Sequence, residues 1–292
     1  LTFGQAVRER LLTDYKVLIL TMPEDAMTDL YDGATDLSEA AKIVGVWNAI
    51  NKKTRDPEVF AGDTDPMERV VAFARDIKTS KAFADTFPQI VNDYLARTRP
   101  EGGDEGGQEE AQAQSVGTEH IDGTMNMAVR DQKMEWLKTP EANTTHILSN
   151  AQLLSEGVDV PTLDAIAFLN PRRSQVDVVQ AVGRVMRLAP GKEYGYIILP
   201  VAVPAGMTAE EALDNSKAFD VVWEVLQALR SHDERFDSLI NQIELNKHKP
   251  KDKISIFDPT DPDKKPGDGG NGTGDDEDTD LGTQLELRLD TL

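Results

Sequence analysis

Four residues in one short segment have the side chains and spacing to bind an anionic ligand. Gln180, Gly183, Arg184 and Arg187 stand in the run QVDVVQAVGRVMR, residues 175–187. Spacings of three and four predict that they share one face of a helix, with valines on the buried face. The two guanidiniums repel each other mildly, and a triphosphate would compensate that repulsion. A solvated basic face on an ordinary helix is the alternative, and spacing alone does not decide between them.

The glycine in this segment supports the first interpretation. A glycine inside a helix costs about 1 kcal/mol relative to alanine. Gly183 therefore needs a reason, such as close approach of another backbone or of a ligand.

A second cluster of polar residues lies upstream, in SNAQLLSEGVDVP. Glu156, Gly157 and Asp159 come together there, shortly before Pro161. Such residues also punctuate ordinary loops between a strand and a helix. Taken alone, this cluster is a weak indication of a site.

The elements that must position these residues alternate between strand-like and helix-like patterns. Such alternation predicts an α/β fold with a mostly parallel sheet covered on both faces and ligands at the carboxyl ends of the strands. The expected strands are Asp14–Leu20, Val70–Ala74, His120–Met125, His146–Ser149, Leu163–Leu169 and Tyr194–Val201. The expected helices are Ser38–Lys52 with Ser38 as its N-cap, one following Val70–Ala74 that Pro88 should kink or break, NMAVRDQKMEWLK, Gln175–Arg187 and Phe219–Leu229.

The charge of the chain is concentrated in two segments. The formal net charge is −21, of which residues 258–292 carry −8 and residues 100–119 carry −6. Both segments are too polar to offset the entropy of ordering them, and we expect them to be disordered. Phosphate contacts need Lys and Arg, and a positive stretch remains between residues 172 and 192, with Arg172, Arg173, Arg184, Arg187 and Lys192.

Composition excludes several classes of site. The chain has no Cys, and its four His show no paired spacing, so we expect no metal site built from this chain alone. No run approaches 18 apolar residues, and charged residues interrupt the first twenty positions, so we expect no membrane span and a cytoplasmic location.

The segments around Glu156 and Arg184, in this order, resemble motifs V and VI of superfamily 2 helicases. The usual motif VI pattern is Q-x-x-G-R-x-x-R, which QAVGRVMR matches without departure. VVAFARDI from Val70 resembles motif IV, and HIDGTM from His120 resembles the strand that follows it. The resemblance covers roughly residues 70–200 and implies a RecA-like domain of three layers, the second of the two in such motors.

A narrower resemblance is to the helicase module of Type ISP restriction-modification enzymes and related phage-defence helicases. It rests on HIDGTMN, SEGVDVPTLDAIAFLNP, DVVQAVGRVMR and PGKEYGYIILPV. Residues 1–22 then resemble the last strand of the first RecA-like domain. The implied partners are double-stranded DNA, a first RecA-like domain in cis or in trans, and nuclease and methyltransferase modules.

The resemblance also implies roles for individual residues. Arg184 and Arg187 stand at the arginine-finger positions, which approach the γ-phosphate of ATP. Gln180, Gly183, Glu156, Gly157 and Asp159 would lie near the nucleotide. The expected contacts with the DNA backbone are Thr124, Ser149, Asn150 and Arg75.

The chain lacks the residues that hold ATP and Mg²⁺ in such motors. There is no G-x-x-x-x-G-K-[ST] sequence, and the one Gly-Lys pair, Gly191–Lys192, precedes a strand and not a helix. The first RecA-like domain would hold both cofactors, so we expect the isolated chain not to hydrolyse ATP.

The implied division of the chain has four parts. Residues 1–60 would be the end of the first domain and a connecting helix, and a start at Leu1 without Met would reflect truncation. Residues 61–205 would form the second RecA-like domain, with a disordered insert at 98–118. Residues 206–250 would be a helical extension, and residues 251–292 a largely disordered acidic tail.

Two other interpretations stay open. A degenerate, non-catalytic RecA-like module could bind DNA or a partner, and a Walker A motif in the upstream reading frame would argue against it. An unrelated nucleotide-binding α/β domain would have to produce the motif series by chance.

Overall fold

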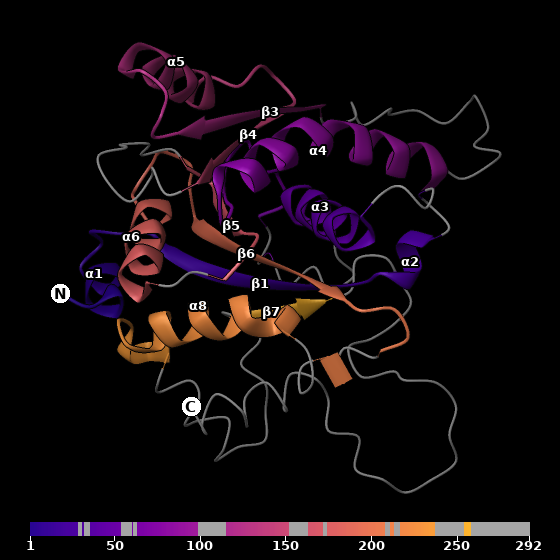
Figure 1. Ribbon diagram of the computed structural model, residues 1–292. Helices are drawn as coiled ribbons and strands as arrows, with labels where there is room; N and C mark the ends of the chain where they lie inside the picture. The colour runs from indigo at the N-terminus through magenta and orange to yellow at the C-terminus, as the bar shows by residue number, and fades with distance from the viewer. Residues whose placement is uncertain are drawn as a thin grey trace, which may run out of the picture.

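A computed structural model describes residues 1–28, 31, 36–53, 60, 63–98, 115–151, 163–171, 174–207, 211–212, 217–236 and 254–257. Within them, seven strands form one sheet in the order β3-β4-β2-β5-β6-β1-β7, and every neighbouring pair is parallel (Figure 1). The strands are β1 Asp14–Pro23, β2 Arg69–Phe73, β3 Ser115–Asp122, β4 Thr144–Ala151, β5 Ala165–Phe168, β6 Tyr194–Val203 and β7 Ile254–Phe257. The predicted parallel α/β sheet is confirmed.

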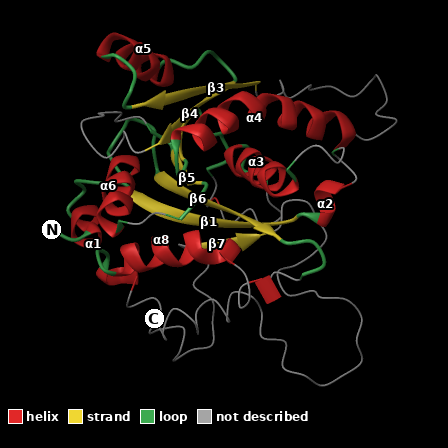
Figure 2. Cartoon of the chain, viewed as in Figure 1, coloured by secondary structure: helices red, strands yellow, loops and turns green. Residues whose placement is uncertain are grey.

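The longer helices cover both faces of this sheet, so the domain has three layers (Figure 2). Along β1, Val17 and Ile19 enter one core cluster while Leu18 and Leu20 enter the other, as the two-residue period of a strand requires. The first face packs against α5 Met127–Lys138, α6 Gln175–Val185 and α8 Asp220–Arg230. The second face packs against α3 Leu37–Ile50 and α4 Ile77–Thr98. Two short helices, α1 Phe3–Arg8 and α2 Asp25–Thr28, and the 3-10 turn η3 Lys217–Phe219 complete the elements named here.

β1 belongs to the same sheet as the strands that follow it. All ten of its residues pair with β6, and Val17–Leu20 also pair with β7. Residues 14–23 therefore have their sheet partners within the described part of this chain. The assignment of residues 1–60 to another domain stays a prediction, which this pairing disfavours.

A polar network fastens the start of β1 to the chain after α8. The Tyr15 hydroxyl donates to Asp233 Oδ2 over 3.0 Å, and the Arg235 guanidinium donates to both Asp233 and Asp14. Asp233 is fully buried. Burial, followed by the nearby charge of Asp233, raises the pKa of Tyr15 well above its ordinary value. The predicted extension after residue 206 is therefore packed on the sheet along α8 and this network.

Pro88 neither breaks α4 nor ends it. The helix runs from Ile77 to Thr98 with the proline inside. Proline has no N–H to donate to the carbonyl four residues earlier, and that carbonyl, of Ala84, accepts a 2.6 Å hydrogen bond from the Thr118 hydroxyl of β3. The prediction of a break was wrong, because a neighbouring strand supplies the donor that the helix lacks.

Three predicted boundaries also need correction. Asp36, and not Ser38, caps α3, since its carboxylate accepts from the N–H groups of Ser38 and Glu39. β3 begins at Ser115, so the last residues of the insert predicted at 98–118 are strand, and residues 99–114 lie outside the described part. β7 lies inside the tail predicted at 251–292 and pairs with β1, while residues 258–292 lie outside the described part.

Candidate functional site

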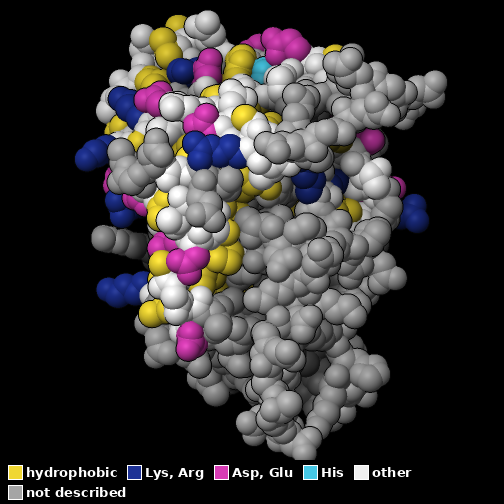
Figure 3. Space-filling model, turned by 90° about the vertical axis from the view of Figure 1, so that its right-hand side faces the viewer, with side chains coloured by type: hydrophobic (Ala, Val, Ile, Leu, Met, Phe, Trp, Pro, Cys, Tyr) yellow, Lys and Arg dark blue, Asp and Glu magenta, His cyan; other side chains and the backbone are white. Residues whose placement is uncertain are grey.

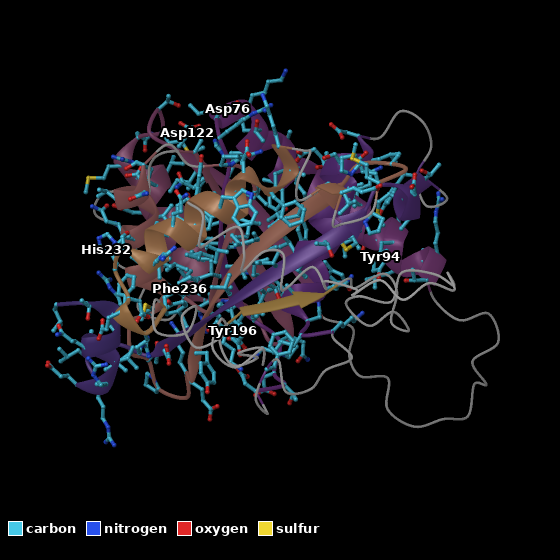
Figure 4. All side chains as sticks on the ribbon, turned by 90° about the horizontal axis from the view of Figure 1, so that it is seen from below. Asp76, Tyr94, Asp122, Tyr196, His232 and Phe236 are labelled. Carbon is cyan, nitrogen blue, oxygen red and sulfur yellow. The ribbon has the colours of Figure 1, made fainter. Side chains whose placement is uncertain are left out.

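The structure divides the predicted site residues between two ends of the sheet. Thr124, Ser149, Asn150 and Arg75 lie where β3, β4 and β2 end. Because the strands are parallel, these ends share one edge, which we call the carboxyl edge; Figure 4 labels Asp76 and Asp122 there. The four predicted DNA contacts are therefore brought to one edge.

The arginine segment runs away from the carboxyl edge. α6 starts beyond β5, rises about 1.5 Å per residue and spans about 15 Å. The carbonyl of Met186, just past its end, accepts from both the N–H and the hydroxyl of Thr13, which precedes β1. Arg187 therefore lies at the amino edge of the sheet, away from the carboxyl ends where the fold was expected to bind ligands.

The predicted face of α6 is accessible. Gln180 is exposed, and Gly183, Arg184 and Arg187 are half-buried, whereas Val178, Val182 and Val185 are fully buried. Burial lowers the pKa of the Arg184 guanidinium, which still leaves it a cation. The helix ends at Val185, so Arg187 follows in a turn and not on the helix as predicted.

Close packing does not explain the glycine of α6. A Cβ added at Gly183 would meet only the Phe3 ring among the described residues, at an ordinary 3.8 Å. A glycine was expected here because another backbone or a ligand would approach closely. No close backbone contact in the described part of the chain accounts for this glycine, and its predicted role near a nucleotide stays a prediction.

Lys192 holds the end of this arginine segment, a structural role that its sequence context did not indicate. Its ammonium donates to Leu163 O over 2.6 Å, to Arg187 O over 3.3 Å, and to Val185 O. Burial lowers the pKa of Lys192 to about 8, against the attraction of the nearby Asp164 carboxylate, which raises it. The only signal in the sequence was a Gly-Lys pair just after the arginines, which we considered only as a phosphate loop.

At the carboxyl edge, Arg75 is exposed, as is Thr124. Arg75 has a side chain that is 68% exposed and contacts Asp76 and Thr79 at the start of α4. Its N–H donates to the Asn170 side chain over 3.2 Å, which ties the end of β2 to the chain after β5.

Ser149 and Asn150 are fully buried, so neither side chain is open to a ligand in this structure. Instead, Ser149 belongs to a row of hydrogen bonds, which we call the buried relay. Ser149 Oγ lies 2.8 Å from Ser80 Oγ, Ser80 Oγ lies 2.7 Å from His120 Nδ1, and His120 Nε2 lies 2.7 Å from Asp122 Oδ2. The relay connects β4, α4 and β3.

The relay ends on an ionised carboxylate next to two exposed groups. Asp122 Oδ1 accepts from the hydroxyl and the N–H of Thr124 over 2.5 and 2.7 Å, and the Lys81 ammonium lies 4.0 Å from Oδ2. The pKa of Asp122 is lowered to about 2, chiefly by the Thr124 hydroxyl bond, with burial opposing and the His120 bond assisting. Sequence reasoning missed Ser80, Lys81 and Asp122.

Both strand histidines, His120 and His146, have hydrogen-bond partners. His120 bonds Ser80 and Asp122, as described above. His146 Nδ1 lies 2.7 Å from Trp136 O, and its ring stacks on the Trp136 ring with centroids 3.9 Å apart. No pattern in the sequence links these positions, because their partners come from other elements.

Some of the predicted site residues lie outside the described part of the chain. They are Glu156, Gly157 and Asp159. Among the residues that are described, no group of three or more His, Cys, Asp or Glu could hold a metal ion, and no helix is long and apolar enough to cross a membrane. On the face shown in Figure 3, acidic and basic side chains are interspersed and form no broad basic patch.

The region that contains this geometry matches a known protein family. Residues 101–189, which include β3, β4, β5 and α6, match the family model described as "Helicase conserved C-terminal domain". The chain contains a superfamily 2 helicase C-terminal domain. The resemblance predicted from QAVGRVMR is thereby confirmed.

The helicase C-terminal domain is similar to two solved Type ISP enzymes. One is the ATP-dependent Type ISP restriction-modification enzyme LlaBIII bound to DNA, with 38% identity and a TM-score of 0.75 over 91% of this chain and 17% of that one. The other is a nuclease-deletion mutant of LlaGI with a DNA substrate mimic, with 31% identity and a TM-score of 0.50 over 87% of this chain and 13% of that one. The narrower resemblance predicted from sequence is confirmed at this level.

A viral sequence shares a shorter segment. A "Probable helicase" of African swine fever virus is 36% identical over 100 residues, which is 34% of this chain and 11% of the viral protein. The chain thus spans less than a fifth of each of these relatives.

Proposed function

We propose that this chain is the C-terminal half of an ATP-driven double-stranded DNA translocase within a restriction-modification or phage-defence enzyme. Its ATPase site forms with a first RecA-like domain, present in cis or in trans, and the enzyme carries nuclease and methyltransferase modules. The observation that carries the proposal is the 38% identity and TM-score of 0.75 with LlaBIII, a DNA-bound restriction enzyme, across 91% of the chain.

Arg184 and Arg187 supply positive charge to the γ-phosphate from the wall opposite the phosphate loop. Negative charge develops on the oxygens of the transferred phosphoryl group, and an arginine finger stabilises that charge. Three features support this role: the half-buried arginines, the exposed Gln180 beside them, and the lack of any contact closer than 3.8 Å over Gly183 among the described residues.

ATP and Mg²⁺ are held mainly by the first RecA-like domain. The residues present here fit a supplementary part, because the α6 face offers donors and cations but no carboxylate cluster for a metal among the described residues. ATP supplies the free energy of translocation, and this chain positions charge against it. By itself the chain is inactive as an ATPase.

The test is DNA-stimulated ATPase activity, measured for the chain alone and for the polypeptide in which it follows a first RecA-like domain. Arg184→Ala and Arg187→Ala should each lower kcat by about 10³-fold or more, and the chain alone should show no activity. Arg97→Ala, which removes an exposed arginine at the far end of α4, is the matched control and should keep full activity.

A well-folded joined polypeptide with no ATPase activity would refute the motor and favour the non-catalytic DNA- or partner-binding module. Activity that survives both arginine substitutions would refute the finger roles alone.

A further inference from the structure

The carboxyl edge contains an arrangement that the proposed function does not use. The buried relay passes through three elements and ends on Asp122, a carboxylate with no exposed surface. Burial of an ionised carboxylate is costly unless hydrogen bonds and counter-charges compensate it. Here four groups do so: the N–H and hydroxyl of Thr124, the His120 imidazole and the Lys81 ammonium.

The number of hydrogen-bond donors on each group determines which of them can also bind a ligand. Thr124 has one hydroxyl proton and one N–H, and both point at Asp122. In this arrangement Thr124 has no donor left for a phosphate oxygen, although the residue is exposed. A phosphate at Thr124 would have to take a donor away from a buried charge.

Lys81 has donors to spare. Its ammonium carries three protons, and its only hydrogen bond or ion pair among the described residues is the 4.0 Å contact with Asp122. The side chain is 55% exposed and belongs to the first turns of α4, beside the end of β3. The carboxylate orients the ammonium without using up its donors.

The donors and acceptors along the relay follow from the ionised carboxylate of Asp122 at one end. Because Asp122 is ionised, it can only accept, so His120 Nε2 donates to it. In a neutral imidazole Nδ1 then accepts from Ser80, and Ser80 in turn accepts from Ser149. Each hydroxyl has one proton, so a change at either end reorients the whole row.

We propose that Lys81 is a DNA phosphate-binding residue at the carboxyl edge and that the buried relay positions it, with His120 as the positioning residue. This inference rests on the proposed function, since it assigns the DNA contact of that same motor. Thr124 and Ser149, expected from the sequence to touch DNA, then act through Asp122. Backbone contact of this kind suits a protein that must step along any sequence.

The test is the salt dependence of DNA affinity. The probe is a fluorescent random-sequence duplex of about 25 base pairs, long enough to cover one domain, titrated with the 292-residue chain between 50 and 200 mM salt. Loss of one phosphate contact reduces the slope of log K against log salt by about 0.9. Lys81→Gln should show this reduction, and Lys81→Arg should restore the wild-type slope.

The positioning role is tested by separate variants. His120→Gln and Ser80→Ala should weaken binding severalfold with the slope unchanged, because the lysine charge remains. Lys138→Gln removes a lysine at the C-terminal end of α5, whose carbonyl contacts Arg69 at the amino edge, and should change neither quantity. The ¹⁵N signals of the His120 imidazole should shift on adding duplex to wild type but not to Lys81→Gln.

Equal salt slopes for wild type and Lys81→Gln, or no binding of the duplex by wild type, would overturn the proposal. An imidazole signal that ignores DNA, or a slope altered in His120→Gln, would overturn the positioning role. None of these outcomes bears on Arg184 and Arg187, whose ATPase test in the joined polypeptide decides the motor itself.

Discussion

Replacement of Lys192 by methionine tests the physical account of the arginine segment most directly. The Lys192 side chain is half-buried at the C-terminal end of α6, where its ammonium donates to carbonyls of Leu163, Val185 and Arg187. Lys192→Met keeps most of the side-chain volume, removes the charge and leaves three carbonyls without this donor. Removal of the charge stabilises the fold because no charge is then buried, whereas loss of the donor costs hydrogen bonds. A stability measured at one pH contains both effects and does not separate them.

The pH dependence does separate them. The pKa of Lys192 falls from its ordinary 10.5 to about 8, which corresponds to about 3 kcal/mol. Since the folded state releases its proton first, the unfolded state binds more protons between these two values. The free energy of unfolding of the wild type should therefore rise across that window, by about 3 kcal/mol from this group, and the rise is lost as the pH falls to 8.

The measurement is urea unfolding of wild type and Lys192→Met at several pH values from 7.5 to 10.5. Other lysines and tyrosines titrate in both proteins and cancel in the difference. The free energy of unfolding of the wild type minus that of Lys192→Met should increase by about 3 kcal/mol as the pH rises. The same difference should stay constant for Lys138→Met, whose side chain is 38% exposed. A constant difference for Lys192→Met would show that the buried ammonium is no more costly than a hydrated one and would refute the reasoning.

Three further substitutions, the last with a matched control, probe packing and buried hydrogen bonds. Gly195→Ala should destabilise the fold by about 1–3 kcal/mol, because the new Cβ would collide with the carbonyl of Val185; thermal unfolding measures this. Gly183→Ala should leave stability unchanged or raise it by up to about 1 kcal/mol, since the new Cβ would meet only the Phe3 ring among the described residues, at an ordinary 3.8 Å. ATPase activity of the joined polypeptide should fall, and a loss of stability instead would point to packing. Asp233→Ala should cost about 3 kcal/mol because it strips a buried network of its acceptor, whereas Arg8→Ala, which opens an exposed pair, should cost less than about 1 kcal/mol.

The fold could be predicted from local patterns wherever burial follows a simple period. Runs such as Val70–Ala74 and Tyr194–Val201 are apolar without interruption, as strands buried on both faces require, and both are strands in the structure. β7 was missed because it is four residues long and stands at the start of an acidic segment. The integrity of α4 was missed because it depends on a hydroxyl of β3 that is thirty residues from Pro88 in the sequence.

The predicted site shows the same division. The residues of α6 share a helix, so their common face followed from spacing alone. The location of Arg187 at the amino edge did not follow, because it depends on how α6 crosses back between β5 and β6 to meet Thr13. The buried relay joins residues forty and sixty-nine positions apart, at Ser80–His120 and Ser80–Ser149, and no local pattern records such contacts.

The buried relay and Lys192, neither of which was predicted from the sequence, hold the two ends of one segment. The chain between Ala151 and Leu163 connects the carboxyl edge to the amino edge, since β4 ends at the former and β5 begins just beyond the latter. At the first edge Ser149 is held by the Ser80 hydroxyl of the buried relay, and at the second Leu163 O is held by the Lys192 ammonium. The two anchors differ in chemistry, so each should respond to its own variable: salt acts on the DNA contact that the relay positions, and alkaline pH acts on Lys192. A motor that couples DNA at one edge to nucleotide beside α6 needs both ends of this segment fixed. We therefore expect substitutions at Ser149 and at Lys192 each to weaken the stimulation of ATPase activity by DNA. The effect at Ser149 should depend on salt, and the effect at Lys192 should depend on alkaline pH.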